Sequence, residues 1–271
     1  MDSSTYALIR MGWRSFQGTV ATYVLGLAGY LGLLMWIYPT IAHTPGLAVV
    51  IRALPKSLVS ATGLETGLGN PGAYLASEFF GTLYLWLLMI LTVMGVIRLV
   101  AQGPARGTAG FWLAGPISRM TWVLTQGVVF WLGLFTVCGL VTIANILAVD
   151  VWDPHQKMAL GRILTLNGMA FVIFAVLSGV IAIIASAMRD DRRATVVGSF
   201  VVLVLYILSA VSSLSPRLAW AGHLSLFYWD RPAAIVAGRQ TFGWSQLFLL
   251  MIAGGLWVLA AWTFRRRDLL L

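Results

Sequence analysis

Charged residues divide this chain into long apolar runs. Each run holds the roughly 20 apolar residues that a helix needs to cross a bilayer, and none shows the alternating strands of about ten residues that build a membrane β-barrel. The pattern therefore predicts an all-α integral membrane protein with six transmembrane helices, at about residues 19–38, 79–101, 120–148, 164–187, 195–215 and 245–264. The stretches without Asp, Glu, Lys or Arg are Ser15–Ile51, Phe79–Ile97, Met120–Val149, Ile163–Met188, Ala194–Pro216 and Thr241–Phe264.

Composition supports this class. Of the 271 residues, 59% are hydrophobic and 10% are charged, whereas a soluble domain has about 25% charged residues. The net charge of +9 comes from basic residues at the ends of the runs. Because these residues are spread over many boundaries instead of forming one patch, we expect no binding to nucleic acid.

The basic residues also predict the orientation. Six spans place both termini on the same face, and that face carries the larger share of arginine. By the positive-inside rule it is cytoplasmic, so we expect a multi-pass protein of the bacterial cell (inner) membrane with both termini in the cytoplasm. The predicted inner residues are Arg10, Arg14, Arg98, Arg106, Arg119, Arg189, Arg192, Arg193, Arg265, Arg266 and Arg267; the predicted outer ones are Arg52, Lys56, Lys157, Arg162, Arg217, Arg231 and Arg239.

Three segments outside the spans have their own patterns. Residues 1–18 place Tyr6, Ile9, Trp13 and Phe16 at helical spacing, which predicts an interfacial helix on the inner surface. Within the outer segment 39–78, apolar residues from 47 to 58 recur at helical spacing and predict a second interfacial helix. The outer segment 216–244 is rich in aromatic residues, so we expect short helices or a re-entrant turn, serving as a membrane anchor or as a lid.

The sequence gives little support for catalysis or for a metal site. No catalytic motif of the common hydrolases or zinc proteases is present, so we expect no enzyme activity and no catalytic residue in this chain. His43, His155 and His223 fall on separate loops, which disfavours zinc. The single cysteine, Cys138, is interpreted as a small packing residue. The spans hold no central charge, which disfavours proton-coupled transport.

Mild polar patterns remain inside the spans. Ser199, Tyr206, Ser209 and Ser213 share one face of the fifth span, where they would line a pathway or bond neighbouring helices. The fourth span has a face of small residues that favours close helix packing.

The segment 104–119 carries the most distinctive sequence motif outside the spans. It presents Phe111, Trp112 and Leu113 on a short polar loop, and large apolar side chains of this kind commonly anchor protein interfaces. The chain has two lysines, Lys56 and Lys157, and neither stands in a phosphate-binding loop. If ATP drives this protein, a separate subunit must bind the nucleotide.

Two phrases resemble the permease subunits of ABC-2 type ABC transporters, and the likeness covers essentially the whole chain. Those permeases commonly carry a phrase similar to E-x-G-T-L-x-x-L-L-x-x-P-I-S-R after their second span. It is matched here by Gly107, Thr108, Pro116, Ile117, Ser118 and Arg119, without the acidic residue and with Ala109–Gly110 in place of bulkier residues. A phrase like F-x-R-R-D near the end is matched by Phe264, Arg266, Arg267 and Asp268.

The resemblance implies a cytoplasmic coupling helix at about 108–114 that docks on an ATPase. The implied contact residues are Thr108, Phe111, Trp112, Leu113, Pro116 and Arg119. The implied partners are ABC ATPase subunits, which bind ATP and Mg, and a second permease copy or a related permease. The expected activity is ATP-driven export. The alternative is a membrane anchor or regulatory subunit that transports nothing.

Overall fold

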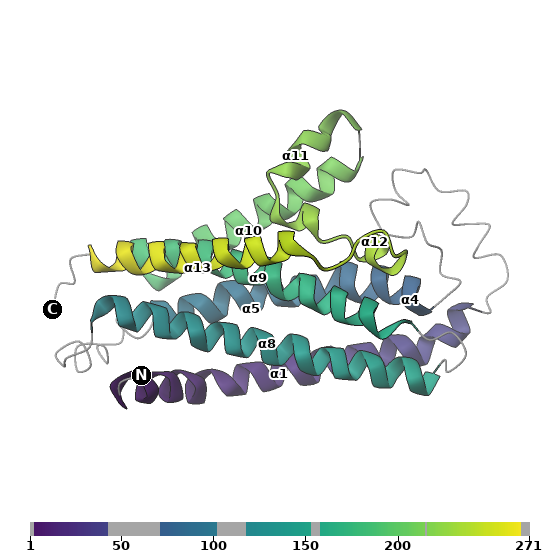
Figure 1. Ribbon diagram of the computed structural model, residues 1–271, viewed down its shortest axis with the longest axis horizontal. Helices are drawn as coiled ribbons and strands as arrows, with labels where there is room; N and C mark the ends of the chain where they lie inside the picture. Colours follow the sequence, from purple (N-terminus) through teal and green to yellow (C-terminus); the bar gives the residue numbers. More distant parts are fainter. Residues whose placement is uncertain (1–2, 43–70, 102–117, 153–157, 215, 267–271) are drawn as a thin grey trace.

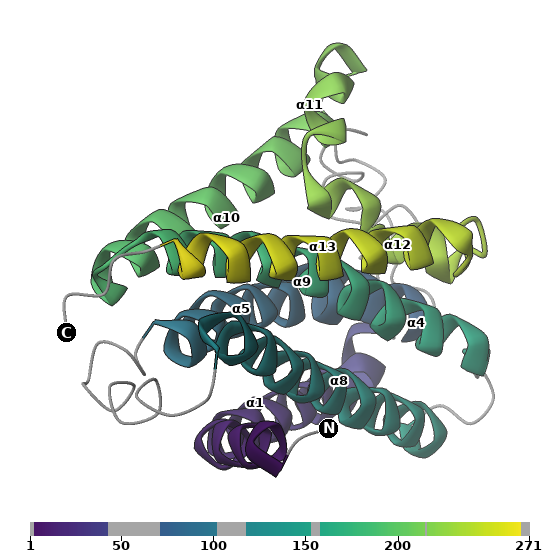
Figure 2. The same ribbon diagram turned by 60° about the vertical axis from the view of Figure 1, so that its left-hand side comes forward.

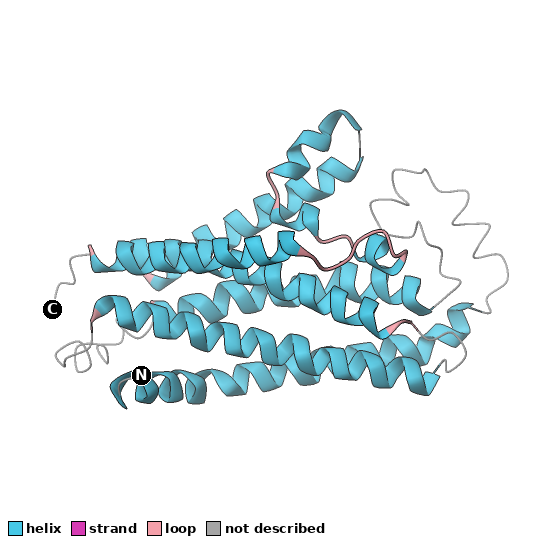
Figure 3. Cartoon of the chain, viewed as in Figure 1, coloured by secondary structure: helices cyan, strands magenta, loops and turns pink. Residues whose placement is uncertain are grey.

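Helices make up about 91% of the residues that the structure describes, and no strand occurs among those residues. The computed structural model describes residues 3–42, 71–101, 118–152, 158–214 and 216–266. Within these ranges, six helices are long and apolar enough to cross a membrane, and Figure 3 shows that helices and the loops between them make up the described chain. The expected all-α class with six such helices is confirmed.

The long helices alternate in direction along the bundle (Figure 1). The start of α1 and the end of α13 consequently lie at the same end. The helices are α1 (Ser3–Ala42), α4 (Pro71–Tyr74), α5 (Tyr84–Val100), α8 (Arg119–Trp152), α9 (Leu160–Ala187), α10 (Asp191–Leu214), α11 (Ala219–His223), α12 (Pro232–Val236) and α13 (Trp244–Arg265), with a π-helix η2 (Leu75–Leu83) and the 3-10 turns η3 (Pro216–Leu218) and η4 (Leu226–Trp229).

Helix α9 forms the centre of the bundle. It packs most extensively on α13 and also on α5, α8 and α10, while α1 packs along α8. In α9, 72% of the spanning window is buried, against 17% in α10. Figure 2 shows that α10 diverges from the other helices and that α11 lies at its far end. Helix α10 is therefore the peripheral span of the fold.

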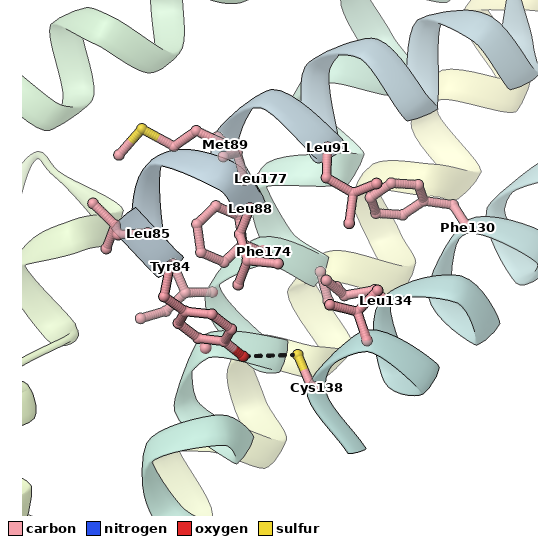
Figure 4. Packing of buried hydrophobic residues seen from close by; sticks show 14 of the residues in the cluster. Tyr84, Leu85, Leu88, Met89, Leu91, Phe130, Leu134, Cys138, Phe174 and Leu177 are labelled. Atoms are coloured by element: carbon pink, nitrogen blue, oxygen red, sulfur yellow. Dashed lines mark hydrogen bonds between the residues drawn. The ribbon is translucent and has the colours of Figure 1, made fainter. Parts of the chain in front are cut away.

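The core between α5, α8 and α9 is built from large apolar side chains that interdigitate. Figure 4 shows Leu88 and Leu91 of α5 with Phe130 and Leu134 of α8 and Phe174 of α9. Four of these five side chains are fully buried, and Leu91 is almost so. Because lipid offers no hydrophobic driving force between helices, close van der Waals packing of this kind holds them together.

Glycines allow the closest approaches between helices. A Cβ on Gly133 would lie 2.5 Å from the Phe16 ring, and one on Gly127 would lie 2.8 Å from the Trp257 ring. Both glycines are on α8, and they admit an aromatic residue from α1 and from α13 respectively. Helix α8 therefore provides a surface on which both α1 and α13 pack closely.

The predicted interfacial helix at 1–18 is not a separate element. Helix α1 runs without a break from Ser3 to Ala42. Its first half lies along α8, with Leu8, Phe16 and Val20 buried and Gly12 close to Val129. The apolar spacing of this segment thus reflects a helix partner. The helix continues through Gly18, since one glycine costs only about 1 kcal/mol.

The second span begins earlier than residue 79. The helical run starts at Pro71 and passes through nine π-helical residues before α5. Glu78, which set the predicted boundary, lies inside this run and is partly buried. Residues 71–78 of the predicted outer segment are thus helical. The predicted interfacial helix at 47–58 lies outside the described residues.

The outer segment between the fifth and sixth spans forms short helices. It contains η3, α11, η4 and α12, and it turns back so that α12 packs on η2 and α9. Among its exposed side chains are Trp220, Leu224 and Trp229. The segment thereby connects the peripheral α10 to the rest of the bundle.

Candidate functional site

Arginine gathers at one end of the bundle. Among the described residues, the end that holds the start of α1 and the end of α13 carries nine arginines, and the opposite end carries four. The nine are Arg10, Arg14, Arg98, Arg119, Arg189, Arg192, Arg193, Arg265 and Arg266. We refer to this side as the arginine-rich end. Ala101 at the end of α5 and Ser118 at the start of α8 both lie there, so the segment that joins them begins and ends at this side.

Most of the predicted contact residues fall in that joining segment. Thr108, Phe111, Trp112, Leu113 and Pro116 lie outside the described residues. The end of the same phrase is described, and it begins α8. The Ser118 hydroxyl accepts a hydrogen bond from the Thr121 backbone N–H at 3.0 Å and lies 2.7 Å from the Thr121 hydroxyl.

Ser118 of the P-I-S-R motif is therefore the N-cap of α8. Serine is a favoured N-cap because its hydroxyl satisfies one of the free N–H groups of the first turn. Arg119 follows as the first residue of α8 and is partly exposed. The cap fixes where the rigid helix begins, so the joining segment is connected to α8 without a flexible spacer after Ser118.

Arg98 joins α5 to α1 at the same end. Its guanidinium donates to the Thr19 hydroxyl and to the Ser15 carbonyl, both at 3.1 Å. On the same stretch of α1, between Ser15 and Thr19, the Phe16 ring lies against Gly95 of α5 and Gly133 of α8. The two helices that flank the joining segment are consequently packed on the same part of α1. A force applied to that segment would act on three helices together.

The predicted C-terminal motif is described in part. Phe264 is fully buried, and the Arg266 guanidinium lies 3.5 Å from the centre of the Trp262 ring. Arg267 and Asp268 lie outside the described residues. At the end of α13, therefore, Phe264 packs into the core and Arg266 stacks on Trp262 at the surface.

The predicted pathway residues of the fifth span lie along α10. Ser199 and Ser213 are exposed, and the Ser213 hydroxyl donates to the Ala210 carbonyl of its own helix. Ser209 is partly buried, and its carbonyl accepts from Ser212. Tyr206 packs its ring on Trp86 at 4.8 Å. The stripe is therefore exposed at both ends and contacts α5 at Tyr206.

A buried polar cluster joins α5, α8 and α9. The contacts between its residues were not predicted from the sequence. The Tyr84 hydroxyl donates to Asn167 Oδ1 at 3.0 Å and lies 3.4 Å from Cys138 Sγ (Figure 4). Two turns along α8 from Cys138, Asn145 is fully buried, and its Oδ1 has no hydrogen-bond partner among the residues that the structure describes. Asn145 and Cys138 share a helix face at a spacing of seven, which is the one signal in the sequence that links them.

A second polar junction joins α8, α9 and α13. The Ser178 hydroxyl accepts hydrogen bonds from the indole N–H of Trp131 and from that of Trp257. The pattern of small residues on the fourth span predicted close packing there, and the contact of Gly179 with Leu256 agrees with it. The hydrogen bonds of Ser178 were not predicted.

These features define a multi-pass α-helical membrane protein whose charge is concentrated at one end. Residues 66–270 match the family described as protein of unknown function DUF2705, and the chain belongs to that family. A comparison with curated proteins gives no match.

Proposed function

We propose that this chain is the membrane-spanning permease subunit of an ATP-driven exporter of the ABC-2 type. One observation carries the proposal. The phrase from Arg106 to Arg119, which resembles the coupling phrase of those permeases, joins two spanning helices at the arginine-rich end of the bundle. By the positive-inside rule that end faces the cytoplasm of a bacterial cell, where an ATPase with its ATP and Mg would lie.

The arrangement of the flanking helices supports coupling. Ser118, within the described end of the phrase, caps α8, and the Arg98 side chain bonds the end of α5 to α1. Apolar anchors such as Phe111 and Trp112 on the segment between them would seat in a groove of the ATPase. In this proposal closure of the ATPase moves α1, α5 and α8 as a group, and a second permease completes the pathway for the substrate.

Co-purification with the cognate ATPase tests the proposal. The ATPase to be tested would be one encoded next to this chain and carrying a phosphate-binding Walker A loop. We expect Phe111→Ala and Trp112→Ala to abolish both co-purification and the permease-dependent change in ATP hydrolysis. The matched control is Trp244→Ala, because Trp244 is 87% exposed at the opposite end of the bundle.

Two outcomes separate the alternatives. If the complex and its ATP hydrolysis survive Phe111→Ala and Trp112→Ala, the docking role of this segment is wrong. If an ATPase binds but its hydrolysis rate is the same with and without the membrane subunit in liposomes, the chain is an anchor or regulatory subunit and not a permease.

A further inference from the structure

The end of α8 and the start of α9 lie at the end of the bundle opposite the arginine-rich end (Figure 1). A cavity of about 340 Å³ lies between them, and we call it the α8–α9 cavity. Its floor is apolar, because Val149, Met158 and Ile163 line it and are buried. Asp150 and Leu160 also line it and are exposed, so they form part of its rim.

The polar groups at this place accept hydrogen bonds and carry negative charge. Asp150 is the one charged residue among the described residues that line the cavity. Arg162 of α9 does not line it, and its guanidinium lies 3.6 Å from the position that a Cβ on Gly238 would take. One turn deeper along α8 than Val149, Asn145 is fully buried, and its Oδ1 has no partner among the described residues. This chemistry favours a ligand that is positively charged and donates N–H groups.

The surface beside the cavity is apolar and exposed. Leu147 and Val151 on α8 and Leu160 and Leu164 on α9 are each more than half exposed. All four lie on helices that are long and apolar enough to cross a membrane. Exposed apolar surface of this kind on a spanning helix contacts lipid. An alkyl chain in the bilayer can therefore lie along this surface while its head group reaches Asp150, which favours an amphiphile over a water-soluble cation.

We propose that the α8–α9 cavity binds a membrane amphiphile with an ammonium head group. The alkyl chain lies on the exposed apolar residues and the buried floor, and the ammonium group donates hydrogen bonds to the Asp150 carboxylate. A carboxylate has about four acceptor positions, so Asp150 can bind an ammonium group in addition to a group of the chain itself. Charge-assisted bonds of this kind are about twice as strong as neutral ones. The inference does not depend on the transport proposal.

Photocrosslinking locates the site. The full chain is reconstituted in phosphatidylcholine nanodiscs and irradiated with dodecylammonium that carries a diazirine in its chain. We expect the label to concentrate on residues 146–150 and 158–163. An excess of unmodified dodecylammonium should abolish this labelling, whereas ethylammonium, which has no long chain, should not. Label spread evenly over the exposed surfaces of all six long helices, or removed equally well by ethylammonium, would overturn the proposal.

Substitutions at the rim test the recognition. Asp150→Asn should lower labelling of the site by about tenfold, because the charge-assisted hydrogen bonds are lost. The control Glu78→Gln removes a carboxylate on η2, outside the cavity, and should leave the labelling unchanged. Ala159→Trp places a large side chain in the cavity lining and should also lower the labelling, whereas Ala237→Trp, at an exposed position outside the cavity, should not. Equal labelling of Asp150→Asn and the native chain would overturn the proposal.

Charge reversal separates recognition from a loss of folding. In Asp150→Lys the site should label more strongly with a dodecyl phosphate that carries the same diazirine than with the dodecylammonium probe, which reverses the preference of the native chain. A loss of structure cannot create a preference for the anion, so this result does not depend on how well Asp150→Asn folds. If Asp150→Lys still preferred the ammonium probe, or preferred neither probe, the assignment of the head group to Asp150 would be wrong.

Discussion

The indole N–H of Trp257 donates a hydrogen bond to the Ser178 hydroxyl at 3.0 Å, between α13 and α9. Trp131 of α8 donates to the same oxygen at 3.2 Å, and Ser178 itself donates to the Ala175 carbonyl at 2.6 Å. A hydroxyl has one donor and two acceptor sites, so all the hydrogen-bonding capacity of Ser178 is used. One small side chain therefore connects three spanning helices.

Replacing Ser178 should destabilise the bundle. Ser178→Ala leaves two indole N–H groups without their acceptor, at a cost of about 1–3 kcal/mol in total, since hydrogen bonds in membranes are worth about 0.6 kcal/mol on average. We expect a lower midpoint of thermal unfolding for the purified protein in detergent. The matched control is Ser186→Ala on the same helix. Ser186 is equally buried, but within the described ranges its hydroxyl has no partner, so a comparable loss there would contradict the interpretation.

The contact between Gly133 and Phe16 gives a second prediction. In Gly133→Ala the new methyl group would lie 2.5 Å from a fully buried ring. Overpacking of this kind costs about 1–3 kcal/mol, so the unfolding midpoint should fall. Gly139→Ala on the same helix is the control. Apart from its own helix backbone, no described residue lies within 4 Å of its added carbon, and alanine favours a helix by about 1 kcal/mol over glycine.

A double variant identifies the cause of any loss at Gly133. Phe16→Leu removes the ring atoms that the new methyl group would meet. Combining Phe16→Leu with Gly133→Ala should cost less than the sum of the two single changes, because the residues are in direct contact. Strict additivity of the unfolding free energies would show that the loss comes from elsewhere.

The buried amides of Asn145 and Asn167 should respond in opposite ways. Asn167 Oδ1 accepts a hydrogen bond from the Tyr84 hydroxyl, whereas Asn145 Oδ1 has no partner in the described part of the chain. Removing an unpaired buried acceptor is neutral or stabilising, but removing a paired one leaves its donor unsatisfied. We expect Asn145→Leu to keep or raise the unfolding midpoint and Asn167→Leu to lower it by the equivalent of about 1–2 kcal/mol. The reverse order in the same thermal assay would show that Asn145 has a partner that stabilises it.

The fold class was predictable because it depends on sums over many residues. Long uncharged runs report helices that cross a membrane, and six of them were recognised. Helix ends were less predictable. Glu78 suggested the start of the second span, yet the chain continues the helix past it to Pro71 through a π-helical segment. A single charged residue does not end a helix when the backbone hydrogen bonds can continue.

Contacts between helices could not be predicted from periodicity. The spacing of Ile9, Trp13 and Phe16 is the same for a helix on a bilayer surface and for one that packs on a neighbour, and the structure shows the second for this part of α1. Ser178 and Trp257 lie 79 positions apart. Their pairing depends on how α9 and α13 are rotated and displaced relative to each other, which a pattern within one helix does not report.

Labelling from outside the cell tests the orientation on which the proposed function depends. In a Cys138→Ser background, Thr241→Cys lies at the end opposite the arginine-rich end and Arg192→Cys lies at the arginine-rich end; both positions are exposed. The positive-inside rule predicts that a membrane-impermeant maleimide labels Thr241→Cys in intact cells, and labels Arg192→Cys only after the membrane is permeabilised.

The opposite labelling pattern would have a direct consequence for the function. It would place the segment between α5 and α8 outside the cell, where an ATPase has no ATP to hydrolyse. Phe111 and Trp112 would then lie on the wrong side of the membrane to contact such a subunit, and the permease proposal would fail. The orientation is therefore the first property to measure, because it can reject the coupling role before any substrate is known.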